Sequence, residues 1–152
     1  MRIDNHPTNP LFITEQHPTS RRYAILEDNG TTLWLYLTAP DQRQIVADTW
    51  VFNRIRPLLT ADELTPVRDT DQPPPILESL ADDDPVCEKP DAHRWAFNWT
   101  PDGEAVAIFR DDQPIAFVRS TDRRGFSRHV IRPSIWGVPW SSKIFQDVFT
   151  IE

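Results

Sequence analysis

The sequence of 152 residues has little cysteine and glycine, with one Cys and four Gly, and it has no long apolar run. A single cysteine excludes a disulfide within the chain. Together with an N-terminus that lacks the apolar stretch of a secretory signal, it predicts a cytoplasmic protein. No run approaches the roughly 18 apolar residues that read as a membrane-spanning helix. The glycines are not clustered, which excludes a glycine-rich phosphate loop.

The sequence also lacks the motifs of common catalytic and metal sites. Its four histidines, His6, His17, His93 and His129, stand at no spacing typical of metal ligands, and a lone cysteine cannot build a structural zinc site. No Gly-x-Ser-x-Gly motif is present. We therefore expect no cofactor, no metal and no catalytic residue set, while an active site assembled from distant residues stays open.

Negative charge is concentrated in one segment. The net charge is −7, and residues 60–91 hold ten acidic and two basic residues, so this segment alone carries −8. Its prolines and acids argue against continuous regular structure, and we expect residues 57–92 to form an acidic, proline-rich connection with Cys87 exposed. This connection is either a solvated excursion or a contact surface for a partner. The candidate contact residues within it are Asp82, Asp83 and Asp84.

The first half of the chain predicts a meander of three strands. Residues 1–20 are expected to form a loosely ordered arm, followed by apolar strands at 23–27 and 33–37. Asn29-Gly30 lies between them and is favoured in a type I′ turn, where both central residues have positive φ. Large apolar side chains on both faces of 33–37 indicate a central strand or one covered on both sides.

Residues 44–55 complete this meander. Their β-branched and aromatic content favours a third strand. The alternative is a helix, because an apolar stripe at helical spacing is formed by Ile45, Val46, Trp50 and Val51.

The second half, beginning with "HRWAFNWTPDGEAVAIFRDDQPIAFV", predicts another three-stranded meander, with turns at 101–103 and 111–114. Neither meander can bury an apolar face alone, so packing one on the other is the simplest solution. We therefore predict a single domain over residues 1–152 that is mainly β, with α+β as the alternative. The two antiparallel meanders would form one sheet, a sandwich or a partly open barrel, with one or two short helices.

The C-terminal residues predict a mixed end to the domain. Residues 126–131 suggest a seventh strand, and residues 133–139 a structured loop. "SSKIFQDVF" offers Ser141 or Ser142 as a cap for a short closing helix. A final edge strand over 148–151 is the alternative.

Two groups of residues near this end are candidate binding residues. The first is a run of basic side chains within fourteen residues, namely Arg119, Arg123, Arg124, Arg128 and Arg132, with His129. Arginine suits bidentate contacts to carboxylate or phosphate, although these residues can equally pair with the chain's own acids. The second group is Trp136 and Trp140, which could anchor an interface or fill the core.

The stretch "WTPDGEAVAIFRDDQPIAFVRSTDRRGFSR", with "LEDNGTTLWLYL" upstream, resembles a bacterial domain-of-unknown-function family, family 2251. The resemblance lies mainly over residues 22–38 and 95–128, and it implies the turn-and-strand pattern. The sequence departs from that family at three polar positions, so no polar site is implied. It has Ile115 where the family tends to have His, Arg119 where it tends to have Asp, and Ser127 where it tends to have Cys. The family brings no activity with it. Residues that match its motif are Trp99, Asp102, Gly103, Pro114, Ala116, Gly125, Phe126 and Arg128.

These observations favour a binding function over an enzyme. We expect a domain that binds another protein, with a toxin-neutralising (immunity-type) protein that masks a basic toxin as one form of this hypothesis. The alternative is a small-molecule or nucleotide-binding domain that uses the arginine cluster at 119–132. The acidic balance disfavours nucleic acid as the partner, and no membrane contact is expected.

Overall fold

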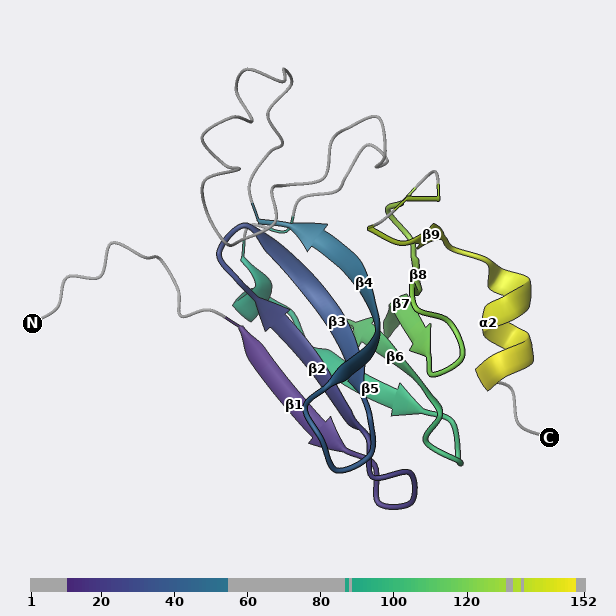
Figure 1. Cartoon of the computed structure of the whole chain (residues 1–152). Helices are drawn as coiled ribbons and strands as arrows, with labels where there is room; N and C mark the ends of the chain where they lie inside the picture. The colour runs from purple at the N-terminus through teal and green to yellow at the C-terminus, as the bar shows by residue number, and fades with distance from the viewer. Residues whose placement is uncertain (1–10, 55–86, 88, 131–132, 135, 150–152) are drawn as a thin grey trace, which may run out of the picture.

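The computed structural model describes residues 11–54, 87, 89–130, 133–134 and 136–149 (Figure 1). These residues form two sheets, a short 3-10 helix at Pro90–Ala92 and helix α2 at Ser142–Phe149. The strands of the first sheet are β1 (Phe12–Gln16), β2 (Tyr23–Asp28), β3 (Thr32–Thr38) and β4 (Ile45–Asn53). Those of the second are β5 (Trp95–Trp99), β6 (Ala105–Arg110), β7 (Gln113–Arg119), β8 (Phe126–Ser127) and β9 (Val138–Pro139).

The two sheets pack face to face around a shared core. Each sheet keeps the order of its strands in the sequence, and neighbours are antiparallel except for the parallel pair β8–β9. Leu35 and Leu37 of β3 share one buried cluster with Val106 of β6 and Val118 of β7. Figure 1 shows β1–β4 lying in front of β5 and β6. The mainly β prediction is confirmed, and among its alternatives the described strands form a sandwich of two open sheets.

Strand β3 is central in its sheet, as its sequence predicts. It pairs with β2 on one side and with β4 on the other. Leu33, Leu35 and Leu37 face the core between the sheets, whereas Trp34 lies on the opposite face. There the Trp34 ring stacks on Trp136, with ring centroids 5.8 Å apart. Both apolar faces are therefore covered. The strand prediction for residues 44–55 is likewise confirmed, by β4 over Ile45–Asn53.

The prediction of a loosely ordered arm over residues 1–20 is wrong for Phe12–Gln16, which form β1 and pair along β2. Most side chains of this edge strand are exposed, so its sequence shows little of the apolar alternation that marks a half-buried strand. Ile13 packs against the core, and Glu15 accepts a hydrogen bond from Trp99 Nε1 at 2.6 Å. That bond joins β1 to the second sheet. Residues 1–10 lie outside the described residues.

The type I′ turn occurs at a different hairpin from the one predicted. In the pair Asn29-Gly30 only Gly30 has a positive φ, of 95°. The Asn29 side chain instead closes this loop, with its Oδ1 accepting from the Thr32 N–H at 2.8 Å. Between β6 and β7, Asp111 and Asp112 form a two-residue connection and have φ of 51° and 71°. Positive φ at both positions is the type I′ geometry.

Asp112→Gly is expected to raise the free energy of unfolding by about 0.5–1 kcal/mol, because a side chain at positive φ is strained and glycine is not. Loss of the ion pair between Asp112 and Arg94 offsets little of this gain, since the two side chains are 80% and 75% exposed. Urea unfolding of the two proteins measures the difference. A lower stability for the variant would contradict this reason.

The closing helix is confirmed. Helix α2 begins at Ser142, and the Oγ of Ser141 caps it by accepting from the Ile144 N–H at 3.2 Å. The alternative edge strand at 148–151 is wrong for residues 148 and 149, which belong to α2. The helix packs its aromatic side chains on the outer face of the second sheet. There the Phe145 ring lies 5.7 Å from the Phe117 ring of β7.

The strand predicted at 126–131 is wrong for residues 128–130, and residue 131 lies outside the described residues. Strand β8 has two residues, after which the Val130 N–H donates to the Ser127 carbonyl at 3.3 Å and the chain turns. Within the loop predicted at 133–139, Val138–Pro139 form β9. The Val138 N–H donates to the Gly125 carbonyl at 2.9 Å, which places β9 parallel to β8.

Most of the predicted acidic connection at 57–92 lies outside the described residues. Cys87 belongs to the part that is described, and it is buried in the core cluster, not exposed as expected. Its N–H donates to the Asn53 carbonyl at 2.7 Å, next to the end of β4. Burial raises the pKa of the Cys87 thiol, with Arg110 and Arg54 opposing the change.

No helix among the described residues has the length and apolar character needed to cross a membrane. No group of three or more His, Cys, Asp or Glu side chains among them could hold a metal ion.

Candidate functional site

The loop that follows β7 is held against the edge of β4 by backbone hydrogen bonds. The Asp48 N–H donates to the Arg123 carbonyl at 3.0 Å, and the Gly125 N–H donates to the Asp48 carbonyl at 2.8 Å. Further along β4, the Trp50 N–H donates to the Trp136 carbonyl at 2.9 Å. These hydrogen bonds to β4 therefore fix the backbone of the loop that carries Arg123 and Arg124.

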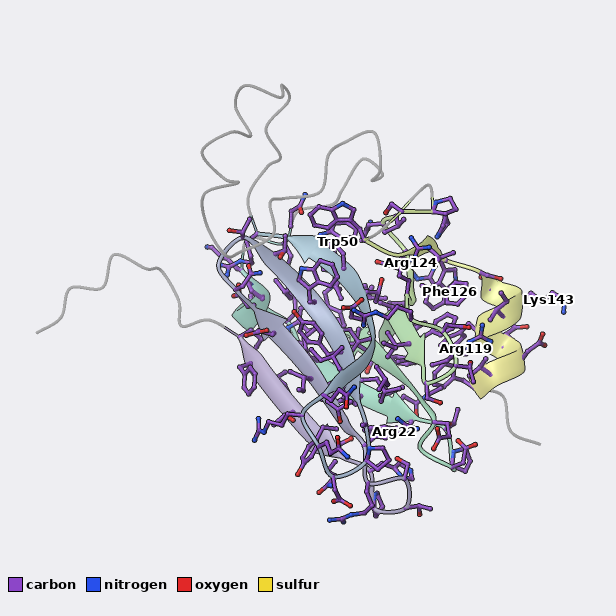
Figure 2. All side chains as sticks on the ribbon, viewed as in Figure 1. Arg22, Trp50, Arg119, Arg124, Phe126 and Lys143 are labelled. Atoms are coloured by element: carbon purple, nitrogen blue, oxygen red, sulfur yellow. The ribbon has the colours of Figure 1, made fainter. Side chains whose placement is uncertain are left out.

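This loop borders a hollow of about 420 Å³ that opens to solvent. Three guanidinium groups contribute to its lining, from the end of β7 and from the loop, and an apolar wall comes from β8 and β9. Figure 2 shows Arg119, Arg124 and Phe126 on the side of the molecule that also carries α2. We call this site the arginine hollow, and its lining residues are Arg119, Thr121, Asp122, Arg123, Arg124, Phe126 and Val138.

Arg119 is the most constrained of the three arginines. Its Nε donates to Asp122 Oδ2 at 2.5 Å, and its Nη2 contacts the same oxygen. Its guanidinium carbon also lies 5.5 Å from the centre of the Phe126 ring. The Arg119 and Asp122 side chains are 30% and 34% exposed, so solvent reaches both. Arg119 is held in place while its charge remains accessible.

The guanidinium groups of Arg123 and Arg124 have different partners. The Arg123 side chain is 69% exposed, and its Nη1 lies 3.9 Å from Asp48 Oδ2, at the limit of an ion pair. Burial raises the pKa of Asp48, and the charge of Arg123 opposes that rise. Arg124 Nη1 donates to the Ser134 carbonyl. A neutral carbonyl partner leaves the positive charge of Arg124 uncompensated by that contact.

Arg128 and His129 do not line the hollow, and Arg132 lies outside the described residues. Arg128 Nε donates to the Pro114 carbonyl at 2.6 Å, and its guanidinium lies 4.2 Å from the centre of the Trp140 ring. Burial lowers the pKa of Arg128. The His129 ring packs at 4.7 Å from the ring of Phe52. These two side chains thus contact other partners and are not among the described lining residues of the hollow.

Trp136 and Trp140 lie in two different aromatic clusters. Trp136 stacks on Trp34 against the outer face of the first sheet. Trp140 packs edge-on against Phe117, at 5.4 Å, on the outer face of the second sheet. Both tryptophans are partly buried, so each fills a cluster and keeps some exposed surface.

Of the remaining candidates, Asp82, Asp83 and Asp84 lie outside the described residues. Four lining residues of the hollow were not predicted as site residues, namely Thr121, Asp122, Phe126 and Val138. Asp122 could have been found, because it follows Arg119 by three residues in a turn, a spacing that favours an ion pair. The contribution of Val138 depends on the parallel pairing of β8 with β9, for which the sequence gives no signal.

The arrangement suits the binding of an anionic group. Guanidinium groups donate planar pairs of N–H groups that match carboxylate and phosphate oxygens. Counting formal charges, three arginines and one aspartate leave the lining with a net charge of two positive units. Phe126 and Val138 offer an apolar wall beside these charges. Together they fit a ligand that carries both an acidic group and an apolar part.

Comparison of the chain with family models, with curated proteins and with solved structures found no match. The resemblance to family 2251 therefore stays a prediction from the sequence.

Proposed function

We propose that this protein is a macromolecule-binding domain that captures acidic side chains of a partner protein in the arginine hollow. The observation that carries this proposal is the position of Arg119, Arg123 and Arg124 around one open hollow with an apolar wall. Arg123 is the residue best placed to meet a partner, because its side chain is 69% exposed and its contact with Asp48 is long. Charge attraction would speed the encounter and would weaken with added salt.

The shape of the hollow favours a protein partner over a small ligand. Small-molecule pockets bury most of their ligand and are lined mainly by apolar side chains. The arginine hollow is open to solvent, and charged residues form most of its lining. A chain segment can lie across such a surface, placing carboxylates on the guanidinium groups and apolar atoms against Phe126 and Val138.

The same geometry weakens the alternative of a nucleotide-binding domain. A nucleotide base commonly stacks on an aromatic side chain, but Phe126, the aromatic residue in the described lining, is 8% exposed and already stacks on Phe117. Trp136 is instead stacked on Trp34, and Trp140 packs against Phe117 and Arg128. Neither tryptophan belongs to the lining of the hollow.

The toxin-neutralising form of the hypothesis concerns a different surface. It relies on the acidic residues at 60–91, including Asp82, Asp83 and Asp84, which would face a basic toxin. It stays a prediction from the sequence. The two surfaces make opposite demands on a partner, since the acidic segment would bind a basic surface and the arginine hollow an acidic one.

Titration with two capped peptides tests the proposal. One peptide alternates glutamate with leucine, and the other has glutamine in place of every glutamate. We expect the acidic peptide to bind about tenfold more tightly than its glutamine counterpart, because charge-assisted hydrogen bonds to arginine are lost in the latter. Isothermal titration calorimetry at low ionic strength measures both affinities. Added salt should reduce the difference.

Matched variants locate the binding surface. Arg123→Gln removes an exposed charge at the hollow and should weaken the acidic peptide about tenfold. Arg94→Gln removes an equally exposed charge, which pairs with Asp112 at the β6–β7 turn, and should leave the affinity unchanged. Equal affinity for the two peptides, or equal losses in the two variants, would overturn the proposed function.

A further inference from the structure

We propose that Asp122 selects against doubly charged ligand groups, so that it weakens the preference of the arginine hollow for a phosphate dianion over a single carboxylate. This inference rests on the proposed function and names the ligand class of the same site. Among the residues that the structure describes, Asp122 is the one acidic residue in the lining of the hollow. Its charge therefore opposes the binding of negative groups there.

Asp122 occupies one of the three guanidinium groups in the unbound protein. Its Oδ2 accepts from Arg119 Nε at 2.5 Å and also contacts Nη2, so two donors on one edge of Arg119 are already used. The Asp122 N–H donates to the Arg119 carbonyl at 3.2 Å, which keeps the carboxylate next to its partner. An incoming anion must use the remaining donors, with the Asp122 carboxylate beside it.

The repulsion from Asp122 depends on the charge of the incoming group. A phosphate monoester carries up to two negative charges near neutral pH, whereas a carboxylate carries one. At a separation of about 6 Å in water, repulsion between unit charges lowers affinity about threefold for a monoanion and about tenfold for a dianion. Binding sites achieve specificity by such repulsion as well as by attraction.

Arg123 and Arg124 add attraction to this repulsion, and they do not change the difference that the Asp122 charge makes. Arg123 shares its charge with Asp48, a second carboxylate at 3.9 Å beside the hollow. Arg124 is oriented by the Ser134 carbonyl, and it attracts both kinds of anion. The attraction from these arginines favours the dianion, and the Asp122 carboxylate opposes that preference. Removing the Asp122 charge should therefore help a dianion more than a monoanion.

Two probes with the same ring and different charge isolate this effect. Phenylacetate carries one negative charge, and phenyl phosphate carries two above about pH 8. Each ring can lie against Phe126 and Val138. Titrations followed in proton–nitrogen NMR spectra give the affinity of each probe for the wild-type protein and for the variants. Weak binding remains measurable by this method.

Asp122→Asn is the test variant, because asparagine keeps an acceptor oxygen for Arg119 and removes the charge. We expect phenyl phosphate to gain about threefold more affinity than phenylacetate does in this variant. In the wild-type protein, phenyl phosphate should bind no more than about tenfold more tightly than phenylacetate, because the described lining keeps two net positive charges. Asp112→Asn is the control. It removes the same charge from the β6–β7 turn, at the opposite end of β7 from Arg119, and should change neither affinity.

The outcomes separate this inference from the proposed function. If both probes bind and both gain equally in Asp122→Asn, the selection by Asp122 is wrong and the binding function stands. A larger gain for phenylacetate than for phenyl phosphate in Asp122→Asn would also overturn the selection. If neither probe shifts the amide signals of the hollow in any variant, the proposed function fails and the selection fails with it.

Discussion

Phe117→Ala is expected to lower the free energy of unfolding by about 3–5 kcal/mol. Phe117 is fully buried on β7, and its ring contacts Phe126, Trp140, Phe145 and Phe149 at centroid distances of 4.6, 5.4, 5.7 and 5.6 Å. Truncation removes these contacts together and leaves a cavity between the second sheet and α2. Urea unfolding followed by circular dichroism measures the loss.

Phe12→Ala is the matched control for that substitution. It deletes the same atoms from a side chain that is 56% exposed on the edge strand β1. We expect a change within about 0.5 kcal/mol, as for most exposed positions. Equal losses at Phe117 and Phe12 would show that the outer face of the second sheet is not packed as described, and that α2 does not rest on it.

Gly125→Ala is expected to lower the free energy of unfolding by about 1–3 kcal/mol through overpacking, and also to weaken the acidic peptide. A Cβ at Gly125 would lie 2.5 Å from the Phe117 carbonyl oxygen and 2.6 Å from Val118 Cγ1. The first of these atoms belongs to the backbone of β7 and cannot move without disturbing the strand. The loop from Arg123 to Gly125 must shift instead, and its hydrogen bonds to Asp48 weaken.

Gly30→Ala separates backbone strain from crowding. Gly30 has φ of +95° and nothing within 4 Å of the position of a Cβ, so alanine there is strained but uncrowded. We expect a loss of about 1–2 kcal/mol and an unchanged affinity for the acidic peptide. If Gly125→Ala bound the peptide as tightly as Gly30→Ala does, the position of the arginine loop would not control binding.

The strands with strong apolar patterns were predictable from the sequence. In β3, Leu33, Leu35 and Leu37 alternate with Trp34 and Tyr36, and this alternation predicted both the strand and its central place. The turn predicted at 101–103 from its Pro-Asp-Gly sequence is also present. Gly103 has φ of +71°, and its N–H donates to the Thr100 carbonyl at 2.9 Å. In both cases the residues nearby in sequence decide the local structure.

Other elements depend on contacts between distant residues. The edge strand β1 is largely exposed, and its contact from Glu15 to Trp99 spans 84 positions of the sequence. Asp112 adopts positive φ although glycine is the residue favoured at the second position of this turn. The carboxylate of Asp111 accepts from the Arg94 N–H at 2.8 Å, and this tertiary contact supports the turn.

The candidate site was predictable as a set of residues but not as a geometry. The basic run identified Arg119, Arg123 and Arg124, which line one hollow. It also included Arg128, which the structure places on Trp140. The backbone bonds between the arginine loop and Asp48 decide which side chains share the hollow. These bonds join residues more than seventy positions apart, and no local pattern signals them.

Mapping the acidic peptide onto the protein by amide chemical-shift changes is the most direct test of the central claim, that the arginine hollow is a binding surface for carboxylates. The account predicts the largest shifts at residues 119–126 and at Val138, with a midpoint at about tenfold higher peptide concentration in Arg123→Gln. Shifts concentrated on β1 and β5, or no shifts at a saturating peptide concentration, would contradict it.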